Sequence, residues 1–318
     1  MTRWLTIAIC SLLALGAAAC GDDDNKDSGG SNSGGGDLKG TIAIDGSSTV
    51  QPFSQAALEL FQEENPDVRI TVGGAGTGDG FEKFCRGELD VADASRPIED
   101  EEKAACKKAG VSYGEVQVAN DGIAIVSSKS LPIRCLKTAQ LEKLFAPKSA
   151  VKTYSELGSG LPNKPVSLFT PGTESGTFDF FTSKVLDTDK EQRENNVQTS
   201  PDDNVLLTGV SGENNALGYF GYSYYEQNQD KVNNVAVDGG SGCKKPTTAD
   251  IQDGSYKPLA RPLFMYPSEK SIREPQVKAF LDFVIKNQDK IAKAAKIVPM
   301  TSQQASRSQQ DLTKAEQG

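Results

Sequence analysis

Short apolar runs alternate with amphipathic segments along most of this chain. Residues 41–44 and 68–72 are extended apolar runs typical of strands, and apolar residues recur at helical spacing between them. A Gly-rich turn follows at 74–80, a helix is predicted from Phe81, and residues 89–92 form the next apolar run. This β-α-β-α order predicts an α/β fold with a mostly parallel sheet, whose ligand site lies at the carboxyl ends of its strands.

Two longer apolar segments, 116–126 and 259–266, are separated by the middle of the chain. They predict two crossovers between lobes, because roughly 280 residues are enough for two α/β lobes rather than one. The amphipathic segment 277–297 is expected to pack back on the first lobe. The predicted division is lobe one at 40–120 plus 262–318, and lobe two at 121–261.

The N-terminal residues have the pattern of an export signal. Arg3 is followed by a short apolar stretch, and small residues precede Cys20, which predicts a lipoprotein signal peptide at 1–19 and acylation of Cys20. A plain secretory signal with an incidental cysteine is the alternative. Residues 20–39 are rich in Gly, Ser and Asp and predict a flexible tether. The protein is therefore expected outside the cytoplasm, anchored to the outer face of the cell membrane.

Four cysteines remain after Cys20, and their even number in an exported chain favours two disulfides over free thiols or a metal site. Four cysteines allow three pairings. Proximity in sequence favours Cys85 with Cys106, which leaves Cys135 with Cys243.

The composition excludes several classes of function. The chain has no histidine, which rules out Ser-His-Asp and Cys-His catalysis and removes the commonest zinc ligand. Without the signal peptide it carries 33 basic and 43 acidic residues, a balance that argues against nucleic-acid binding. The protein is expected to be a monomeric binding protein rather than an enzyme, without a cofactor or a metal.

Three segments place hydroxyls or backbone amides where a helix is predicted to begin. They are 45–50, 74–80 and 173–178, each of them following an apolar run. Helix starts carry unpaired amides and partial positive charge, so three such starts predict convergence on one anion. Each segment alone could equally be a helix cap or a tight turn.

A fourth segment adds charged groups after a predicted strand. Asp93 and Ser95 are expected to face the same way if the strand continues, and Arg96 offers a planar fork of donors suited to an oxyanion. A surface salt bridge is the alternative for Arg96. The tetrad from Ser149 to Lys152 also matches the SxxK pattern of some hydrolases, but it lacks the SDN and KTG companions of that class.

The order of these motifs resembles a known family. "GSSTVQPF", "GAGTGDGF", "DVADASRPI", "DGIAIV", "ESGTFDFF" and "ALGYFGYSYY" are similar to segments of the periplasmic phosphate-binding proteins of Pst ABC importers. The resemblance implies a two-lobed periplasmic-binding-protein fold of type II, hinged on two strands, that delivers phosphate to a membrane permease. By position it implies phosphate contacts from Ser48, Thr49, Val50, Thr77, Asp93, Ser95, Arg96, Ser175, Gly176 and Thr177.

Two further expectations follow from the chemistry of phosphate. Phosphate carries a proton near neutral pH and sulfate does not, so a cleft carboxylate would favour phosphate; Asp93 is the first candidate and Asp79 the second. Many members of the family carry an arginine four residues before the SGT serine, where this chain has Pro171. Arg96 is therefore the expected cleft cation. Another oxyanion, such as sulfate or molybdate, is the alternative ligand.

Overall fold

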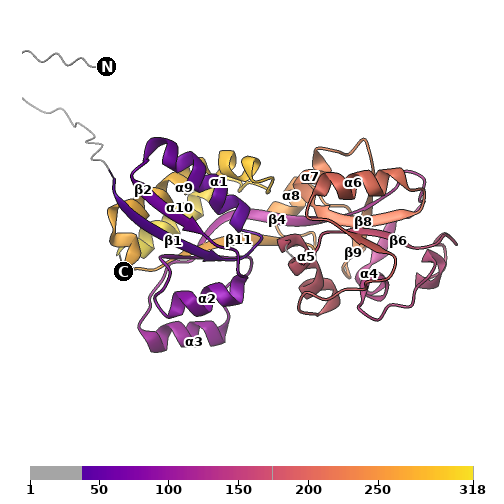
Figure 1. The fold of residues 1–318 in the computed structure, drawn as a ribbon, viewed down its shortest axis with the longest axis horizontal. Coiled ribbons are helices and arrows are strands. Elements are labelled where there is room, and N and C mark those ends of the chain that lie inside the picture. Colours follow the sequence, from indigo (N-terminus) through magenta and orange to yellow (C-terminus); the bar gives the residue numbers. More distant parts are fainter. Residues whose placement is uncertain (1–37, 174, 318) are drawn as a thin grey trace, which may run out of the picture. The chain divides into compact units, whose positions relative to one another are not determined.

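The computed structural model describes residues 38–173 and 175–317. The predicted signal peptide, Cys20 and all but the last two residues of the tether lie outside the described residues. Within these ranges, no helix combines the length and apolarity needed to cross a membrane. The described chain forms an α/β fold with two lobes, each built around its own hydrophobic core (Figure 1).

The first lobe contains the N-terminal strands and the C-terminal helices. The parallel strands β2 and β3 flank β1, because each apolar run leads through a helix into a neighbouring strand of the same direction. Its elements are β1 (Gly40–Gly46), α1 (Gln51–Glu64), β2 (Val68–Val72), α2 (Thr77–Cys85), β3 (Val91–Ala94), α3 (Asp100–Ala109), the 3₁₀ turn η3 (Ser271–Arg273), α9 (Pro275–Ala294) and α10 (Ser302–Gln317).

The second lobe is made from the middle of the chain. Strand β6 pairs in parallel with β7 and β8, and β5 pairs in parallel with β9. Its elements are β5 (Cys135–Lys137), α4 (Thr138–Phe145), η1 (Tyr154–Leu157), β6 (Ser167–Thr170), α5 (Gly176–Phe181), the π-helix η2 (Thr182–Leu186), β7 (Val197–Thr199), α6 (Asp203–Gly212), β8 (Ala216–Gly221), α7 (Tyr222–Glu226), β9 (Asn233–Asp238), β10 (Cys243–Lys244) and α8 (Thr248–Gln252).

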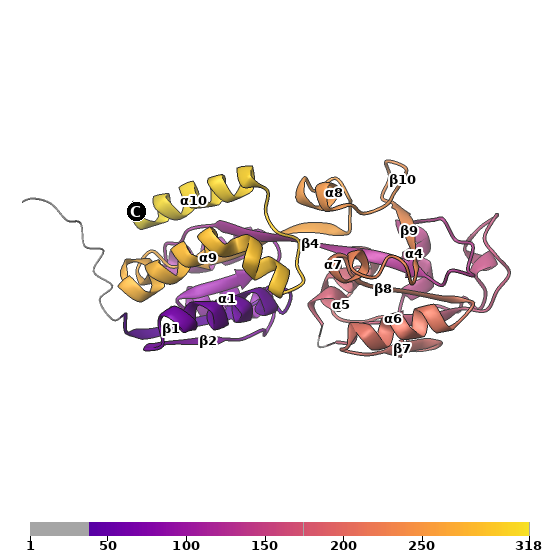
Figure 2. The same ribbon diagram turned by 90° about the horizontal axis from the view of Figure 1, so that it is seen from above.

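Two long strands, β4 (Val116–Ser127) and β11 (Ala260–Pro267), connect the lobes (Figures 1 and 2). They pair with each other in antiparallel fashion, from Gly122 with Ala260 to Val116 with Met265. Beyond this segment β4 continues into the second lobe and pairs with β8 and β9, while β11 pairs with β3 of the first. The antiparallel pairs of the sheet involve these two strands and the short β10.

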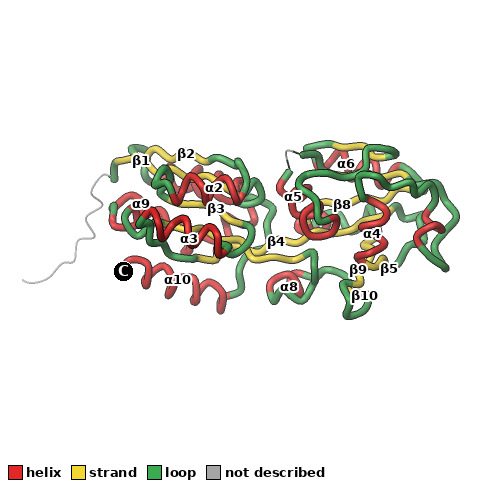
Figure 3. Tube along the Cα trace, turned by 90° about the horizontal axis from the view of Figure 1, so that it is seen from below, coloured by secondary structure: helices red, strands yellow, loops and turns green. Residues whose placement is uncertain are grey.

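Side chains along β3 and β11 point alternately to the two faces of the sheet, so the first lobe has one apolar layer on each face. Leu263 and Met265 of β11 join the apolar cluster under α1, α9 and α10, whereas Phe264 and Tyr266 join the cluster under α2 and α3. Figures 1 and 3 show α2 and α3 together on one side of the sheet. In β3, Val91 faces the α1 layer, so Asp93, two residues on, is directed to the same layer.

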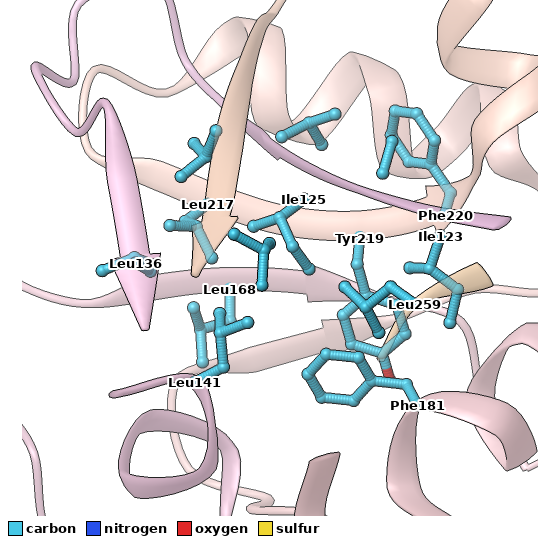
Figure 4. Close-up of a cluster of buried hydrophobic side chains, with 14 of the residues drawn as sticks. Ile123, Ile125, Leu136, Leu141, Leu168, Phe181, Leu217, Tyr219, Phe220 and Leu259 are labelled. Carbon is cyan, nitrogen blue, oxygen red and sulfur yellow. The ribbon is translucent and has the colours of Figure 1, made fainter. Parts of the chain in front are cut away.

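The second lobe has a larger apolar core. Ile123 and Ile125 of β4 lie among buried residues of β6, β8 and α5, with Tyr219 stacked on Phe181 at a centroid distance of 4.0 Å (Figure 4). One disulfide lies in each lobe and pairs the cysteines that sequence proximity favours. Cys85 is bonded to Cys106 between α2 and α3, and Cys135 is bonded to Cys243 between β5 and β10.

Candidate functional site

A cavity of about 550 Å³ lies between the loops of the two lobes. Hydroxyl side chains from three segments of the first lobe line it, namely Ser47, Ser48, Thr49, Thr77 and Ser95. Its formal charges are balanced, because four basic and four acidic side chains share the wall. These are Arg96, Lys184, Lys190 and Arg261, and Asp79, Glu99, Asp179 and Asp189. The described residues contain no group of three or more His, Cys, Asp or Glu placed to hold a metal ion.

The loop after β1 presents Ser48 and Thr49 to this cavity. The backbone carbonyl of Ser47 accepts hydrogen bonds from the amides of Val50 and Gln51, at 3.0 and 2.9 Å, and its hydroxyl accepts one from the amide of Thr49 at 3.2 Å. Ser47 thus holds the turn that leads into α1, whose own N-cap is Val50 and has no side-chain capping hydrogen bond. Val50 does not line the cavity, since its side chain is buried in the core.

The Gly-rich loop approaches the first loop through close backbone contacts. Gly76 has a φ of +118° and donates to the carbonyl of Gly46 at 2.7 Å, and a Cβ on Gly80 would lie only 2.5 Å from the Cα of Gly46. Helix α2 begins at Thr77, four residues before the predicted start. The Thr77 hydroxyl lies 3.2 Å from that of Ser95, so the two segments form one wall.

Asp93 does not line the cavity, in contrast to the prediction. Strand β3 ends at Ala94, so the expected alternation stops there and Ser95 turns towards Thr77. Asp93 itself has no exposed surface, and its Oδ2 accepts a hydrogen bond of 2.5 Å from Ser54 in α1. Burial raises the pKa of the Asp93 carboxyl to about 8.

Arg96 does line the cavity, but its guanidinium is engaged elsewhere. Its two terminal nitrogens donate to the two carboxylate oxygens of Glu102, at 2.8 and 2.7 Å, and its Nε lies 3.2 Å from Glu99. The hydrogen bonds that Arg96 donates to Glu102 raise the pKa of Arg96 above its usual value. This bidentate pair is the salt bridge that was the alternative reading of Arg96.

The cavity wall also contains a largely buried cation that the sequence analysis missed, Arg261 of β11. Its Nη2 donates to the Thr49 hydroxyl at 2.6 Å and to the Gly176 carbonyl at 3.2 Å. Both Nε and Nη2 also donate to Asp121 of β4, at 3.3 and 3.2 Å. Its guanidinium carbon lies 3.7 Å from the ring centroid of Phe180.

Burial shifts the pKa values of both Arg261 and Asp121. The side chains of Arg261 and Asp121 are each 11% exposed. Burial lowers the pKa of Arg261, while Asp121 acts to raise it, and burial raises the pKa of Asp121 against the opposing effect of Arg261. Arginine keeps its proton even when it is buried, so the site retains a fixed positive charge. The signal in the sequence was a lone arginine within an otherwise apolar strand.

The third predicted helix start lies beside the cavity rather than in its wall. The Ser175 hydroxyl accepts a hydrogen bond from the Thr177 amide at 3.2 Å and so caps α5. Gly176 abuts Thr49, because a Cβ at this position would lie 2.2 Å from the Thr49 Oγ1. The loops of the two lobes are therefore in direct contact at this point.

The SxxK tetrad is part of the scaffold. The Ser149 hydroxyl donates to the carbonyl of Lys143 at 2.7 Å and accepts a hydrogen bond from the buried Arg193 at 3.3 Å. Neither Ser149 nor Lys152 lines the cavity.

Comparisons with known proteins agree on the type of fold. Residues 31–288 match the PBP superfamily domain. The chain is 38% identical over 318 residues to a protein named phosphate-binding protein PstS from Staphylococcus saprophyticus, which covers 98% of this chain and 95% of that protein.

Two solved structures are also similar. A possible phosphate-binding protein from Planctomyces limnophilus has 40% identity and a TM-score of 0.82, over 88% of this chain and 99% of that one. A putative phosphate ABC transporter substrate-binding protein from Clostridium perfringens, with bound phosphate, has 28% identity and a TM-score of 0.59, over 82% and 100% of the two chains.

Proposed function

This chain belongs to the PBP superfamily and, within it, to the PstS phosphate-binding proteins, and on this basis we propose that it captures inorganic phosphate outside the cytoplasm and delivers it to an ABC permease. The similar protein from Clostridium perfringens is described as the substrate-binding protein of a phosphate ABC transporter, which supports the permease as partner. These relatives are named as binding proteins, in keeping with a role in capture rather than catalysis.

The observation that carries the proposal is the position of Arg261 among hydroxyls. Its guanidinium reaches Thr49, and the hydroxyls of Ser48, Thr77 and Ser95 line the same cavity. A buried guanidinium combined with several hydroxyl donors matches the oxygens of a tetrahedral oxyanion. We assign these five residues to direct phosphate contact, with Arg261 in place of the arginine that Pro171 replaces.

The remaining predicted contacts require the lobes to move. Ser175, Gly176 and Thr177 begin α5 directly beside Thr49, so a small shift of the second lobe would bring their backbone amides to an anion held by the first. Arg96 would join the phosphate shell only by leaving Glu102. Val50 and Asp93 would support the binding loop rather than contact the phosphate. Val50 is buried in the core, and the backbone carbonyl of Asp93 accepts a hydrogen bond of 2.8 Å from the Ser47 amide.

The moving bodies in this proposal are residues 40–120 with 262–318 and residues 121–261. Separate apolar clusters support this division, and β4 and β11 are the connections on which the lobes would hinge. Phosphate that contacts both bodies would stabilise the closed form, which is the form that a permease could recognise.

We propose further that the protein is held at the outer face of the membrane by acylation of Cys20, followed by the tether at 20–39. The support comes from the sequence alone, since small residues precede Cys20 after a short apolar stretch. Metabolic labelling of expressing cells with a radioactive fatty acid tests this anchor, with Cys20→Ala as the comparison. Label is expected on the wild-type protein and not on Cys20→Ala, and an unlabelled wild-type protein would contradict the anchor.

The function is tested by calorimetric titration of the soluble body, from residue 21 onward, with phosphate and then with sulfate near neutral pH. Tight one-to-one phosphate binding that excess sulfate does not displace is expected. Preferential binding of sulfate or molybdate would keep the fold and change the ligand, whereas no binding of any oxyanion would contradict the proposal.

A further inference from the structure

The two strands that connect the lobes carry different groups on their two faces. Arg261 of β11, paired with Asp121 of β4, lines the cavity assigned to phosphate. The next pair in the register, Asn120 with Pro262, lines a separate cavity of about 560 Å³. Because neighbouring residues of a strand point to opposite faces, this second cavity lies behind the connecting strands. Figures 2 and 3 show α8 and α10, which supply much of its wall, on one side of β4.

On this back face, a cluster of side-chain amides joins α8 of the second lobe to the C-terminal segment of the first. Gln252 Nε2 donates to the carbonyl of Pro299 at 2.9 Å, and Gln304 Nε2 donates to the carbonyl of Gln252 at 2.8 Å. Gln304 and Asn120 also exchange two hydrogen bonds, at 3.1 and 3.2 Å. The first two bonds cross from one lobe to the other, and the others tie them to β4.

The chain between α9 and α10 belongs to the cores of both lobes. Val298 is buried in the apolar cluster of the second lobe, whereas Ile297 and Met300 lie in that of the first. The backbone of Val298 exchanges two hydrogen bonds with Asn120, at 2.8 and 3.0 Å. This segment is therefore a third link between the lobes, besides β4 and β11.

Gln252, Gln304 and residues 298–300 form what we call the back clasp. Its bonds are made in the same conformation in which the cleft loops touch, since Gly176 abuts Thr49 on the opposite face. A rotation about the connecting strands that opened the cleft would press the back faces together. Hydrogen bonds of 2.8 and 2.9 Å have no room to shorten, so α8 would have to slide past the C-terminal segment and break them. The clasp bonds thus depend on the angle between the lobes.

We propose that the back clasp stabilises the conformation in which the lobes are together, and that it thereby raises the affinity for phosphate without contacting it. The inference rests on the proposed function and concerns the conformational control of that same site. A contact made in one of two conformations shifts the equilibrium towards that conformation by its own free energy. The fraction of molecules in the binding conformation then scales the apparent affinity.

The test compares the phosphate affinity of wild-type protein, Gln252→Ala and Gln304→Ala by calorimetric titration. Gln252→Ala removes the bond to Pro299, and Gln304→Ala removes the bonds to Asn120 and to the Gln252 carbonyl. The affinity for phosphate should fall roughly 3- to 10-fold in Gln252→Ala and at least as far in Gln304→Ala, because one hydrogen bond contributes a factor of this size.

A second measurement separates control of the lobes from a merely structural role. A methyl group at Gly176 would lie 2.2 Å from Thr49 Oγ1, so Gly176→Ala holds the cleft loops apart. In that background the clasp has little left to stabilise, and Gln304→Ala should cause almost no further loss of phosphate affinity. An equal loss in both backgrounds would overturn the inference, because the clasp would then act independently of closure.

Gln303→Ala is the matched control. Gln303 is the preceding residue of α10, is exposed and lines the same back cavity, but it is not part of the clasp. Its replacement should leave the phosphate affinity unchanged. If Gln304→Ala is poorly folded by circular dichroism, Gln304→Glu keeps the acceptor for Asn120 and removes only the donor.

The outcomes separate the two claims. Tight phosphate binding by the wild type, with the same affinity in Gln252→Ala and Gln304→Ala, would overturn the clasp and leave the proposed function intact. Tighter binding by these variants would also overturn it, because the clasp would then hold the lobes apart. Failure of the wild type to bind phosphate would overturn the proposed function and this inference together.

Discussion

The guanidinium of Arg261 and the hydroxyl of Thr49 lie 2.6 Å apart, although 212 residues separate them in the chain. The pairing of β11 with β4 brings the arginine to the mouth of the first loop, and Asp121, its direct partner in β4, holds the guanidinium in place. A charge on a strand that connects the lobes is thus available to both of them, as its contact with Gly176 shows.

Replacement of Arg261 is expected to weaken phosphate binding more than any change of a cavity hydroxyl. Arg261→Gln removes the buried positive charge and leaves Asp121 unpaired, so the affinity for phosphate should fall roughly 30-fold or more. Arg261→Lys keeps the charge but loses the planar fork, and its affinity should lie in between. Calorimetric titration measures both.

Arg134→Gln is a suitable control, because this arginine is exposed and lies outside the cavity wall. The double variant Arg261→Gln/Asp121→Asn removes both partners of the pair. It should recover much of the stability lost in Arg261→Gln but none of the affinity. Wild-type affinity in either single variant of Arg261 would show that the anion binds elsewhere.

The contact between Gly176 and Thr49 predicts a second effect on binding. A methyl group at Gly176 would lie 2.2 Å from Thr49 Oγ1 and 2.4 Å from its amide nitrogen, so Gly176→Ala must push the two loops apart. We expect the lobes to separate at little cost in stability, but phosphate would then lose its contacts with the backbone amides at the start of α5. We expect at least a tenfold loss of phosphate affinity with a nearly unchanged melting temperature.

Gly212→Ala provides the comparison for this change, since a Cβ there meets no atom within 4 Å. It lies in the same lobe, at the end of α6. Small-angle scattering with and without phosphate reports on closure. An unchanged affinity in Gly176→Ala would mean that the two loops need not touch when phosphate is bound.

Local patterns in the sequence predicted much of this site. The hydroxyls of Ser48, Thr49, Thr77 and Ser95 line the cavity because strand ends and helix starts are recognisable within a few residues. The parallel order of the strands in the first lobe then brings these segments to one edge. Such features depend on the residues next to them in the chain.

The parts that sequence reasoning missed depend on distant pairing or on a single strand end. Arg261 lies within an apolar strand, and only its alignment with Asp121 in β4 makes it a cleft cation. The prediction for Asp93 assumed that the strand continues through Ser95, but β3 ends at Ala94. The end of the strand lets Ser95 turn towards Thr77 and the cavity, whereas Asp93 keeps the α1 side of the sheet that it shares with Val91.

Removal of each of the two disulfides is expected to lower the free energy of unfolding by a different amount. The first closes a segment of 21 residues and the second one of 108 residues. Because a longer closed loop restricts the unfolded chain more, removal of Cys85–Cys106 should cost about 3 kcal/mol and removal of Cys135–Cys243 about 4–5 kcal/mol. Paired Cys→Ser variants, unfolded in urea, measure both values. The reverse order would show that strain or residual structure outweighs the loop entropy.

The buried Asp93 predicts how stability depends on pH. Burial raises its pKa to about 8 in the folded protein, whereas the unfolded chain releases this proton near the usual value of 3.8. Between these values the folded state holds a proton that the unfolded state lacks. The Asp93 contribution is therefore fully present below about pH 4, and the free energy of unfolding should fall by up to about 1.4 kcal/mol per pH unit as the pH rises towards 8.

Asp93→Asn should remove this dependence, because the amide keeps the acceptor for Ser54 and has no proton to lose. Urea unfolding at pH 5, 6, 7 and 8 should give a steeper fall in the free energy of unfolding for the wild type than for the variant. Asp67→Asn, at an exposed aspartate of the same lobe, should follow the wild-type slope. Parallel curves for wild type and Asp93→Asn would mean that Asp93 is ionised in the folded protein at neutral pH, paired with a donor other than Ser54.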